Sequence, residues 1–255
     1  MRIDFHFTPS QADELTLRDK TVVVIDVLRA STSIVTALSN GAREIIPATT
    51  VESAMKISGN LAGNTVILGG ERNGKRIEGF NLGNSPLEYT EERVRGKAII
   101  FTSTNGSQAI VRARYAQELV VCGFINISTV ADFLRERPRD VVILCAGRNG
   151  MFSMEDTVCG GMLLSRVVDE TAAETSLSDG AMAAMVLSRS YGKGLLRMVK
   201  STEHGRYLEE IGFGEDLKIC VAVDSVPVLP VLEGNVLRRR RELEKREPVP
   251  HTVTS

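Results

Sequence analysis

The chain has no long hydrophobic run and almost no net charge. Within its 255 residues, no window approaches the roughly 20 apolar residues that a membrane-spanning helix needs. Its 31 Lys and Arg residues are balanced by 32 Asp and Glu, which leaves a net charge of -1. Without an overall positive field, we expect neither nucleic acid nor a membrane as a partner. A hydrophobic content of 43% instead predicts a globular protein with one sizeable core or two modest ones.

Cysteine is scarce, and its spacing excludes some kinds of site. The four cysteines form no C-x-x-C pair. Cys122, Cys145 and Cys220 end or interrupt β-branched runs, and Cys159 lies in a predicted helix. Such spacing is typical of buried free thiols rather than of disulfides or a zinc site. We therefore expect a cytoplasmic protein.

Two nucleotide-binding motifs are also missing. Neither G-x-G-x-x-G nor G-x-x-x-x-G-K-[ST] follows a predicted strand. This absence disfavours a nucleotide-dependent oxidoreductase or transferase, which a titration with NAD or ATP would test. A non-catalytic module that binds an anionic metabolite stays open as a second alternative.

Apolar runs of strand length alternate with helical segments through the first 150 residues. We predict strands at 22–26, 43–47, 65–69, 97–101, 118–122 and 140–145. Helices are predicted at about 31–39, 51–61, 105–115 and 127–136. This alternation indicates an α/β fold, with a mostly parallel or mixed sheet flanked by helices in α/β/α layers.

The remainder of the chain has a different pattern. From Ser153 to about Gly212 it is helical, with apolar residues on a 3.6-residue spacing at 157–168 and 179–190, before one last strand at 218–223. We expect an α/β domain at 1–150 that carries most of the active site. Residues 151–235 would pack on it or form a second lobe, and 236–255 would be a charged tail. The Arg238–Arg241 run precedes three glutamates, so a solvated helix end is favoured over a nucleic-acid contact.

Three predicted strands run straight into polar loops that open helices. The loops are Leu28–Ser33, Thr102–Ser107 and Ala146–Gly150. In an open α/β sheet, ligands lie at the carboxyl ends of the parallel strands, where helix N-termini present unpaired N–H groups to anions. We therefore predict a pocket for a phosphorylated or similarly anionic small molecule.

Asp26 is the first candidate for chemistry in this pocket. A carboxylate is costly in a core but suits the end of a strand, where it can bind a metal ion or act as a nucleophile. A helix N-cap, or a partner for Arg29, is the structural alternative. Arg29 itself could clamp an anion with two hydrogen bonds. Ser31 and Thr32 are either substrate hydrogen-bonding groups or ordinary helix caps.

Further acids and arginines follow other strands. Glu71 and Arg72 lie in a glycine-rich segment after the strand at 65–69, and Glu155 and Asp156 open a helix, where the macrodipole alone would favour acids. With Asp26, these acids offer the hard oxygen ligands that Mg²⁺ prefers. The candidate metal ligands are Asp26, Glu71, Glu155 and Asp156. The candidate substrate-binding residues are Arg29, Ser31, Thr32, Arg72, Asn84, Thr104, Asn105, Gly106, Arg148 and Asn149.

Taken in order, five motifs resemble the 2-phosphosulfolactate phosphatase family over about residues 3–230. They are Val24–Thr32, Gly70–Gly74, Gly79-Phe80 with Leu82–Pro86, Thr104–Gly106, and Cys145–Gly147 through Glu155-Asp156. The likeness implies a Mg²⁺-dependent phosphoric monoester hydrolase that converts 2-phosphosulfolactate to sulfolactate and phosphate, a step toward coenzyme M. A phosphatase for another small phosphoester is the nearest alternative. A homo-oligomer is left open.

The residues do not settle how the phosphoryl group would be attacked. Asp26 could attack it directly, or bind the metal while water attacks. Aspartyl-phosphate enzymes of the haloacid dehalogenase type carry a second Asp two residues on, where this chain has Leu28. His204, whose ordinary pKa suits proton transfer, is the candidate proton donor to the leaving group, although a lone histidine is more often structural.

Overall fold

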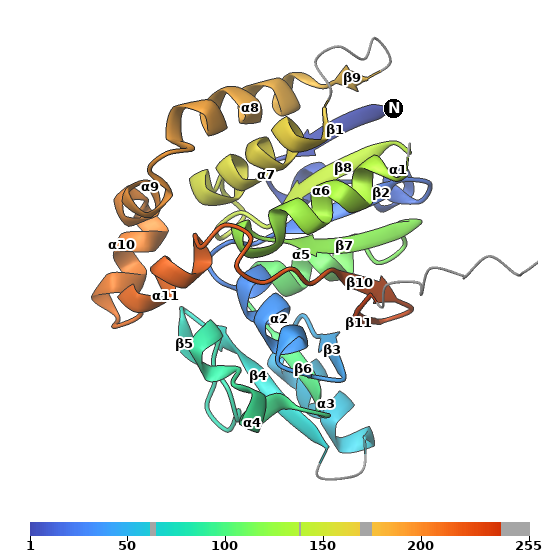
Figure 1. The fold of residues 1–255 in the computed structure, drawn as a ribbon. Helices are drawn as coiled ribbons and strands as arrows, with labels where there is room; N and C mark the ends of the chain where they lie inside the picture. The colour runs from blue at the N-terminus through green and yellow to red at the C-terminus, as the bar shows by residue number, and fades with distance from the viewer. Residues whose placement is uncertain (62–64, 138, 169–174, 241–255) are drawn as a thin grey trace, which may run out of the picture.

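The computed structural model describes residues 1–61, 65–137, 139–168 and 175–240, and Figure 1 shows its strands crossing the molecule between layers of helices. The strands are β1 Arg2–His6, β2 Thr21–Ile25, β3 Glu44–Pro47, β4 Val66–Arg72, β5 Lys75–Arg76, β6 Ala98–Thr102, β7 Glu118–Cys122, β8 Val141–Cys145, β9 Ser176–Leu177, β10 Pro230–Glu233 and β11 Val236–Arg239. The α-helices are α1 Glu14–Leu17, α2 Ala30–Ser39, α3 Val51–Asn60, α4 Glu91–Val94, α5 Gly106–Arg112, α6 Ile127–Arg135, α7 Met154–Val167, α8 Asp179–Tyr191, α9 Leu195–Ser201, α10 Glu203–Glu210 and α11 Gly214–Cys220. Short 3₁₀ turns lie at Pro9–Gln11, Pro86–Glu88 and Phe124–Asn126.

The sheet consists of two parallel blocks joined by an antiparallel hairpin. Its strand order is β5-β4-β6-β3-β11-β10-β7-β2-β8-β1-β9. One block is β4-β6-β3 and the other is β7-β2-β8-β1-β9, and neighbouring strands within each block are parallel. The β10–β11 hairpin lies between them, where Leu237 pairs with Ile45 of β3 and Val231 pairs with Val120 of β7. The last strands of the described residues therefore close the gap between the two blocks.

Strand β2 shows why helices cover both faces of the sheet. All five of its residues are buried, and successive side chains of a strand point to opposite faces. Val23 and Ile25 pack in one apolar cluster with α6 and α7, whereas Val22 and Val24 pack in another with α2 and α5. The predicted α/β class, with a mixed sheet between helical layers, is confirmed.

The expected strand at 218–223 is wrong, because α11 covers the first half of that segment. Leu217 and Cys220 are both fully buried in the core cluster beneath α6 and α7, so packing of a helical face overrides the strand pattern of the sequence. Cys220 consequently lies in a helix, although all four cysteines are free and buried as expected. Among the described residues, no helix is long and apolar enough to cross a membrane.

The C-terminal strands are a second correction. Arg238 and Arg239, expected at the end of a solvated helix, lie in β11, and residues 241–255 of the predicted tail fall outside the described residues. Two residues, Gly234 and Asn235, connect β10 to β11, and Gly234 has a positive φ of 63°. A two-residue Gly-Asn loop between apolar runs is typical of a β-hairpin, and this was the signal missed in the sequence.

Candidate functional site

The three polar loops meet in one cavity of about 110 Å³, which we call the polar pocket. The residues that line it are Asp26, Leu28, Arg29, Glu71, Asn73, Gly74, Asn84, Thr104, Asn105, Arg148, Asn149, His204 and Tyr207. Most of them lie at or just after the ends of β2 and β8 in one block of the sheet and of β4 and β6 in the other, and α10 closes one side. Residues of all three loops therefore line one cavity, and its use for an anionic ligand stays a prediction.

Asp26 follows the last residue of β2 and is only 6% exposed. Its Oδ1 accepts a hydrogen bond of 3.2 Å from the N–H of Ala30 at the start of α2. Burial raises the pKa of Asp26 to about 6, partly offset by the neighbouring His204. A carboxylate with this pKa is mostly ionised at neutral pH and still able to exchange a proton near it.

Gly106 lies against this carboxylate at the start of α5. A Cβ at this position would lie 2.6 Å from Asp26 Oδ2 and 2.6 Å from Ala30 Cβ. Gly106 therefore does not line the pocket but leaves room for the Asp26 side chain.

Glu71 connects the glycine-rich turn after β4 to the loop after β6. Its Oε1 accepts from the Thr104 N–H at 2.7 Å, and its Oε2 accepts from the Gly74 N–H at 2.8 Å and from the Thr104 hydroxyl at 3.2 Å. The side chain is 7% exposed and lines the polar pocket. The next residue in the strand, Arg72, points elsewhere and donates to the Glu71 and Thr49 carbonyls.

Arg29 lines the pocket but is held by a buried ion pair. Its Nη1 donates to Asp216 Oδ2 at 2.7 Å, its Nη2 donates to the Gly74 carbonyl at 2.6 Å, and its guanidinium stacks 4.2 Å from the centre of the Phe213 ring. Arg29 and Asp216 are 2% and 1% exposed. The guanidinium is therefore held in a buried ion pair with its counter-charge and is not a free clamp.

Arg148 and Asn149 come from the loop after β8. Arg148 Nη1 lies 2.7 Å from Glu203 Oε1, yet this buried nitrogen makes no hydrogen bond of acceptable geometry. The Asn149 N–H donates to Asn105 Oδ1 at 2.9 Å, which joins the loops after β8 and β6. Asn84 Oδ1 is likewise buried in the pocket without a hydrogen-bond partner. Arg148 thus has an ionic partner, whereas the unpaired Asn84 Oδ1 beside the cavity favours a polar ligand.

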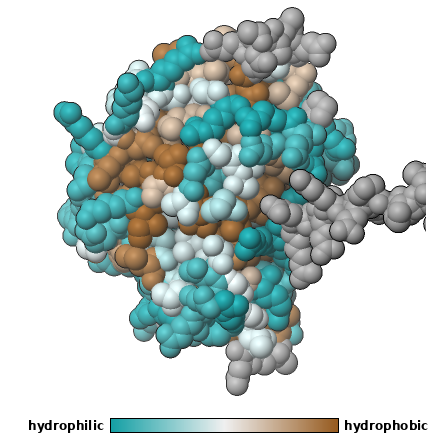
Figure 2. Space-filling model, in the orientation of Figure 1, coloured by the Kyte–Doolittle hydropathy of each residue, from teal (hydrophilic) through white to brown (hydrophobic). Residues whose placement is uncertain are grey.

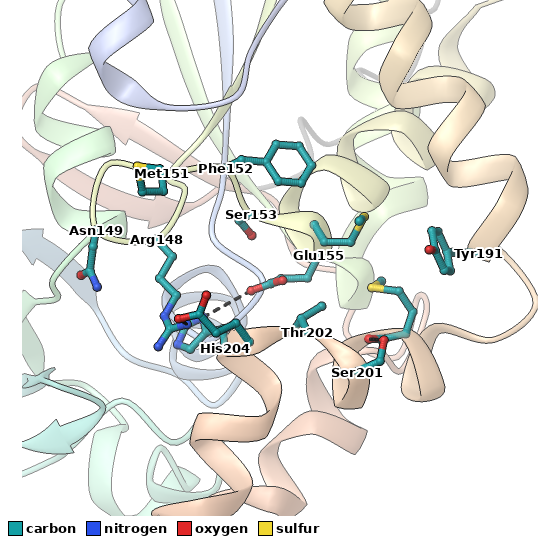
Figure 3. A pocket seen from close by; sticks show the side chains of 13 residues that line it. Arg148, Asn149, Met151, Phe152, Ser153, Glu155, Tyr191, Ser201, Thr202 and His204 are labelled. Carbon is teal, nitrogen blue, oxygen red and sulfur yellow. Dashed lines mark hydrogen bonds and ion pairs between the residues drawn. The ribbon is translucent and has the colours of Figure 1, made fainter.

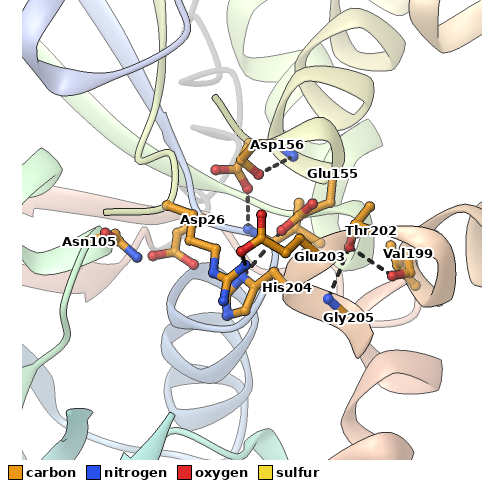
Figure 4. A network of polar contacts seen from close by, with 12 residues as sticks. Asp26, Asn105, Glu155, Asp156, Val199, Thr202, Glu203, His204 and Gly205 are labelled. Carbon is orange, nitrogen blue, oxygen red and sulfur yellow. Dashed lines mark hydrogen bonds and ion pairs between the residues drawn. The ribbon is translucent and has the colours of Figure 1, made fainter. Parts of the chain in front are cut away.

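His204 reaches the pocket from the first turn of α10. Its Nδ1 lies 3.3 Å from Glu155 Oε1, and the Glu155 side chain is buried at the start of α7. Figure 4 shows the side chains of Asp26, Glu155 and His204 directed toward one another from three different elements. This contact uses one of the two ring nitrogens of His204.

Asp156 lies next to Glu155 but does not line the polar pocket. Its Oδ1 accepts from the Val27 N–H at 2.8 Å and its Oδ2 from the Gly147 N–H at 3.1 Å, so it ties the loops after β2 and β8 together. Burial and the nearby Asp26 and Glu155 carboxylates raise the pKa of Asp156 well above its ordinary value. In this arrangement Asp156 positions the two loops.

Ser31 and Thr32 also serve the backbone rather than the pocket. Ser31 Oγ accepts from the Asp26 N–H at 2.9 Å, and the Thr32 hydroxyl donates to the Val27 carbonyl at 3.1 Å. Both side chains are buried within the first turn of α2. The structure thus brings Asp26, Arg29, Glu71, Asn84, Thr104, Asn105, Arg148, Asn149 and His204 to the polar pocket, and leaves Ser31, Thr32, Arg72, Gly106, Glu155 and Asp156 out of its lining.

Asp216 and Tyr207 are not among the site residues predicted from the sequence. Asp216 follows Gly214-Glu215 and reads as a helix-opening acid, a signal hidden by the mistaken strand at 218–223. It also accepts a 2.7 Å hydrogen bond from the Ser85 hydroxyl. Tyr207 lines the pocket one helical turn after His204, and its hydroxyl donates to the Asn73 carbonyl at 2.9 Å.

The donor set fits a magnesium ion that retains water. Among the described residues no group of three His, Cys, Asp or Glu side chains is placed to hold a metal by itself. Mg²⁺ commonly uses only one or two carboxylates and completes its shell with water and substrate phosphate. Asp26 and Glu71 are the two carboxylates that line the polar pocket.

Comparison with known proteins gives a consistent result. The family model described as 2-phosphosulpholactate phosphatase matches residues 6–235. A probable 2-phosphosulfolactate phosphatase of Caldanaerobacter subterraneus subsp. tengcongensis is 40% identical over 242 residues, which cover 95% of this chain and all of the relative. Proteins of the same name from Clostridium novyi and Thermotoga maritima are each 40% identical, over 90% and 85% of this chain and 96% and 91% of the relatives. The expected resemblance and the expected enzyme class, a phosphoric monoester hydrolase, are confirmed, and the chain belongs to the 2-phosphosulfolactate phosphatase family.

Proposed function

We propose that this chain hydrolyses 2-phosphosulfolactate to sulfolactate and phosphate, with Mg²⁺ bound in the polar pocket. The relatives' names support the substrate. The observation that carries the proposal is that a buried carboxylate, a histidine and an arginine, Asp26, His204 and Arg148, line the same cavity. These are the groups that hydrolysis of an anionic phosphoester requires.

Charge recognition falls to the two arginines in the pocket. The proposed substrate carries a phosphate, a sulfonate and a carboxylate. Arg148 is ion-paired with the exposed Glu203 and would donate to one of them in place of that glutamate. Arg29 is fixed in an ion pair with Asp216 and would line the site without moving. The side-chain amide of Asn105, just before α5, would donate a further hydrogen bond to a phosphoryl oxygen, whereas both donors of Thr104 are directed at Glu71.

Asp26 and Glu71 would hold the Mg²⁺ ion, because they are the carboxylates that line the polar pocket. When bound, the ion would neutralise negative charge on the transferring phosphoryl group. Asp26 either serves only as this ligand or attacks the phosphorus itself, and both roles require its ionised form.

His204 would protonate the leaving alkoxide. Its Nδ1 faces Glu155 at 3.3 Å, and this contact would orient the ring so that the other nitrogen gives up the proton. Glu155 would therefore act through His204 as a positioning residue. We further propose a cytoplasmic enzyme with a small phosphoester as its ligand, without nucleic-acid or membrane partners, and leave homo-oligomerisation open.

The test is phosphate release from 2-phosphosulfolactate, 2-phospholactate and phosphoglycolate, each with Mg²⁺ and with EDTA. The proposal predicts release chiefly from 2-phosphosulfolactate and only with Mg²⁺. Equal release in EDTA would remove the metal from the proposal, and preference for another ester would change the substrate. Absence of release from a folded protein would contradict the proposed function.

A further inference from the structure

Glu203 pairs with Arg148 although it does not line the polar pocket. It lines a neighbouring cavity of about 370 Å³, which shares Arg148, Asn149 and His204 with the polar pocket. Figure 3 shows the Arg148 and His204 side chains near one another at the polar end of this neighbouring cavity, beside the Glu155–His204 contact. Arg148 therefore lies where the two cavities meet, and Glu203 approaches it from the neighbouring one.

The start of α10 explains why an acid can stand at position 203. The Thr202 hydroxyl caps this helix and accepts from the Gly205 N–H at 3.0 Å, and Glu203 is the first helical residue. The helix macrodipole favours an acid in a first turn without any further partner. The helix start thus accounts for the acid itself, whereas the direction of its side chain toward Arg148 needs a separate explanation.

The contact between the two side chains is close but incomplete. Glu203 Oε1 lies 2.7 Å from Arg148 Nη1, yet this buried nitrogen makes no hydrogen bond of acceptable geometry. A ligand oxygen aligned with the N–H would form the charge-assisted hydrogen bond that Glu203 does not form. An anionic group that enters the site can therefore replace Glu203 at Arg148.

Displacement of Glu203 requires little rearrangement. The Glu203 side chain is 84% exposed against 21% for Arg148, and Figure 2 shows hydrophilic surface where α10 lies. Ion pairs with so exposed a partner are weak, because water solvates the carboxylate almost as well. Arg148 has supports of its own, since its N–H donates to the Met151 carbonyl at 2.9 Å and its guanidinium lies 5.6 Å from the centre of the Tyr207 ring. Glu203 can thus move into water while Arg148 stays in place.

We propose that Glu203 determines the affinity of the site for anions, because it occupies Arg148 in the empty site and yields it to an anionic group of the ester. This inference rests on the proposed function, in which Arg148 binds one of the anionic groups of the substrate. After hydrolysis, Glu203 competes with the products for the same guanidinium. The competition weakens the binding of every anion that reaches Arg148 and favours release of the products.

The test is calorimetric binding of the two products, inorganic phosphate and sulfolactate, to the wild type and to Glu203→Gln with Mg²⁺ present. Loss of the competing charge should tighten binding of at least one product about two- to fivefold. The product affected identifies the group that meets Arg148, and KM for 2-phosphosulfolactate should fall by a similar factor. Glu210→Gln is the matched control, because it removes the same charge from an exposed residue of α10 outside both cavities, and it should bind as the wild type does.

The outcomes separate this inference from the proposed function. Unchanged binding of both products by Glu203→Gln would overturn the inference, as would absence of binding to both the wild type and this variant. Equal tightening in Glu210→Gln would show a general effect of charge and would also overturn it. Hydrolysis of 2-phosphosulfolactate with unchanged KM in Glu203→Gln would reject the inference alone. Tighter product binding by Glu203→Gln without hydrolysis of any ester would support the inference and reject the proposed function.

Discussion

At the scale of single residues, the site is built around a carboxylate that the fold keeps from water. Asp26 has one backbone donor, from Ala30, and two further carboxylates, Glu71 and Glu155, close enough to raise its pKa. Burial of an ionised acid with so few partners opposes folding. Such a cost is common where a group serves chemistry rather than stability.

The raised pKa predicts a pH-dependent stability cost. The pKa of Asp26 is about 6 in the folded protein against 3.8 ordinarily, so the folded state binds this proton more tightly than the unfolded chain does. The resulting contribution to stability is fully present below pH 3.8 and is lost as the pH rises through 6. In metal-free buffer, Asp26→Asn should therefore stabilise the protein at pH 8, by a few kcal/mol at most, on the order of 1.4 kcal/mol for each unit of the shift. Thermal unfolding at pH 4 and pH 8 measures this, and an equal change at both would contradict it.

Gly106 predicts a steric effect beside the same carboxylate. Gly106→Ala would place a methyl group 2.6 Å from Asp26 Oδ2, so Asp26 or α5 must shift. We expect destabilisation of about 1–3 kcal/mol and a large loss of phosphate release. Gly59→Ala, where nothing lies within 4 Å, is the control and should be neutral or stabilising. Similar unfolding midpoints for both variants would show that the close approach has no consequence.

At the scale of secondary-structure elements, the segments that the sequence predicts well are those whose signals are local. The run 22–26 is β-branched and leads into hydroxyl residues, so β2 and α2 follow from the chain itself. The α11 segment has local signals of both kinds, with Glu215 and Asp216 favouring a helix start and Ile219–Val223 favouring a strand. Burial of Leu217 and Cys220 against distant residues decides for the helix. Local sequence could not show this.

Separation along the sequence also explains why Asp216 could not be predicted as the partner of Arg29. Asp216 lies 187 residues away and also accepts from Ser85, so it links α11 to the loops beside the polar pocket. Asp216→Ala should destabilise the protein by about 3–5 kcal/mol, because Arg29 would remain buried without its counter-charge. Glu215→Ala removes an exposed neighbour and should cost less than about 1 kcal/mol. Denaturant unfolding of both variants compares them, and equal midpoints would contradict the role given to the ion pair.

At the scale of the whole molecule, the β10–β11 hairpin connects the two parallel blocks whose loops form the polar pocket. The positions of Asp26 and Arg148 in one block, and of Glu71 and Thr104 in the other, therefore depend on strands near the end of the described chain. From the sequence, each loop could be assigned to its own strand. The order of the strands depends on pairings such as Leu237 with Ile45, which no local pattern encodes.

Leu237 is the side chain of the hairpin that tests this connection. It is fully buried, so Leu237→Ala should destabilise the protein by about 2–5 kcal/mol and lower activity through the relative placement of the two blocks. Leu87→Ala removes the same atoms from a side chain that is 55% exposed and should have little effect on stability. Chemical denaturation and phosphate release are the two readouts. A Leu237→Ala protein as stable as Leu87→Ala would contradict the connecting role.

The most direct test of the account is phosphate release from 2-phosphosulfolactate by the wild type and by Asp26→Asn, with Mg²⁺ at pH 7.5. Circular dichroism would establish that both proteins are folded. Asp26→Asn keeps the shape of the side chain and removes the charge that either proposed role needs. We expect release by the wild type and a loss of at least about a thousandfold in the variant, comparable to the removal of a catalytic group in other hydrolases. Near-normal release by folded Asp26→Asn would contradict the assignment of the polar pocket as the active site.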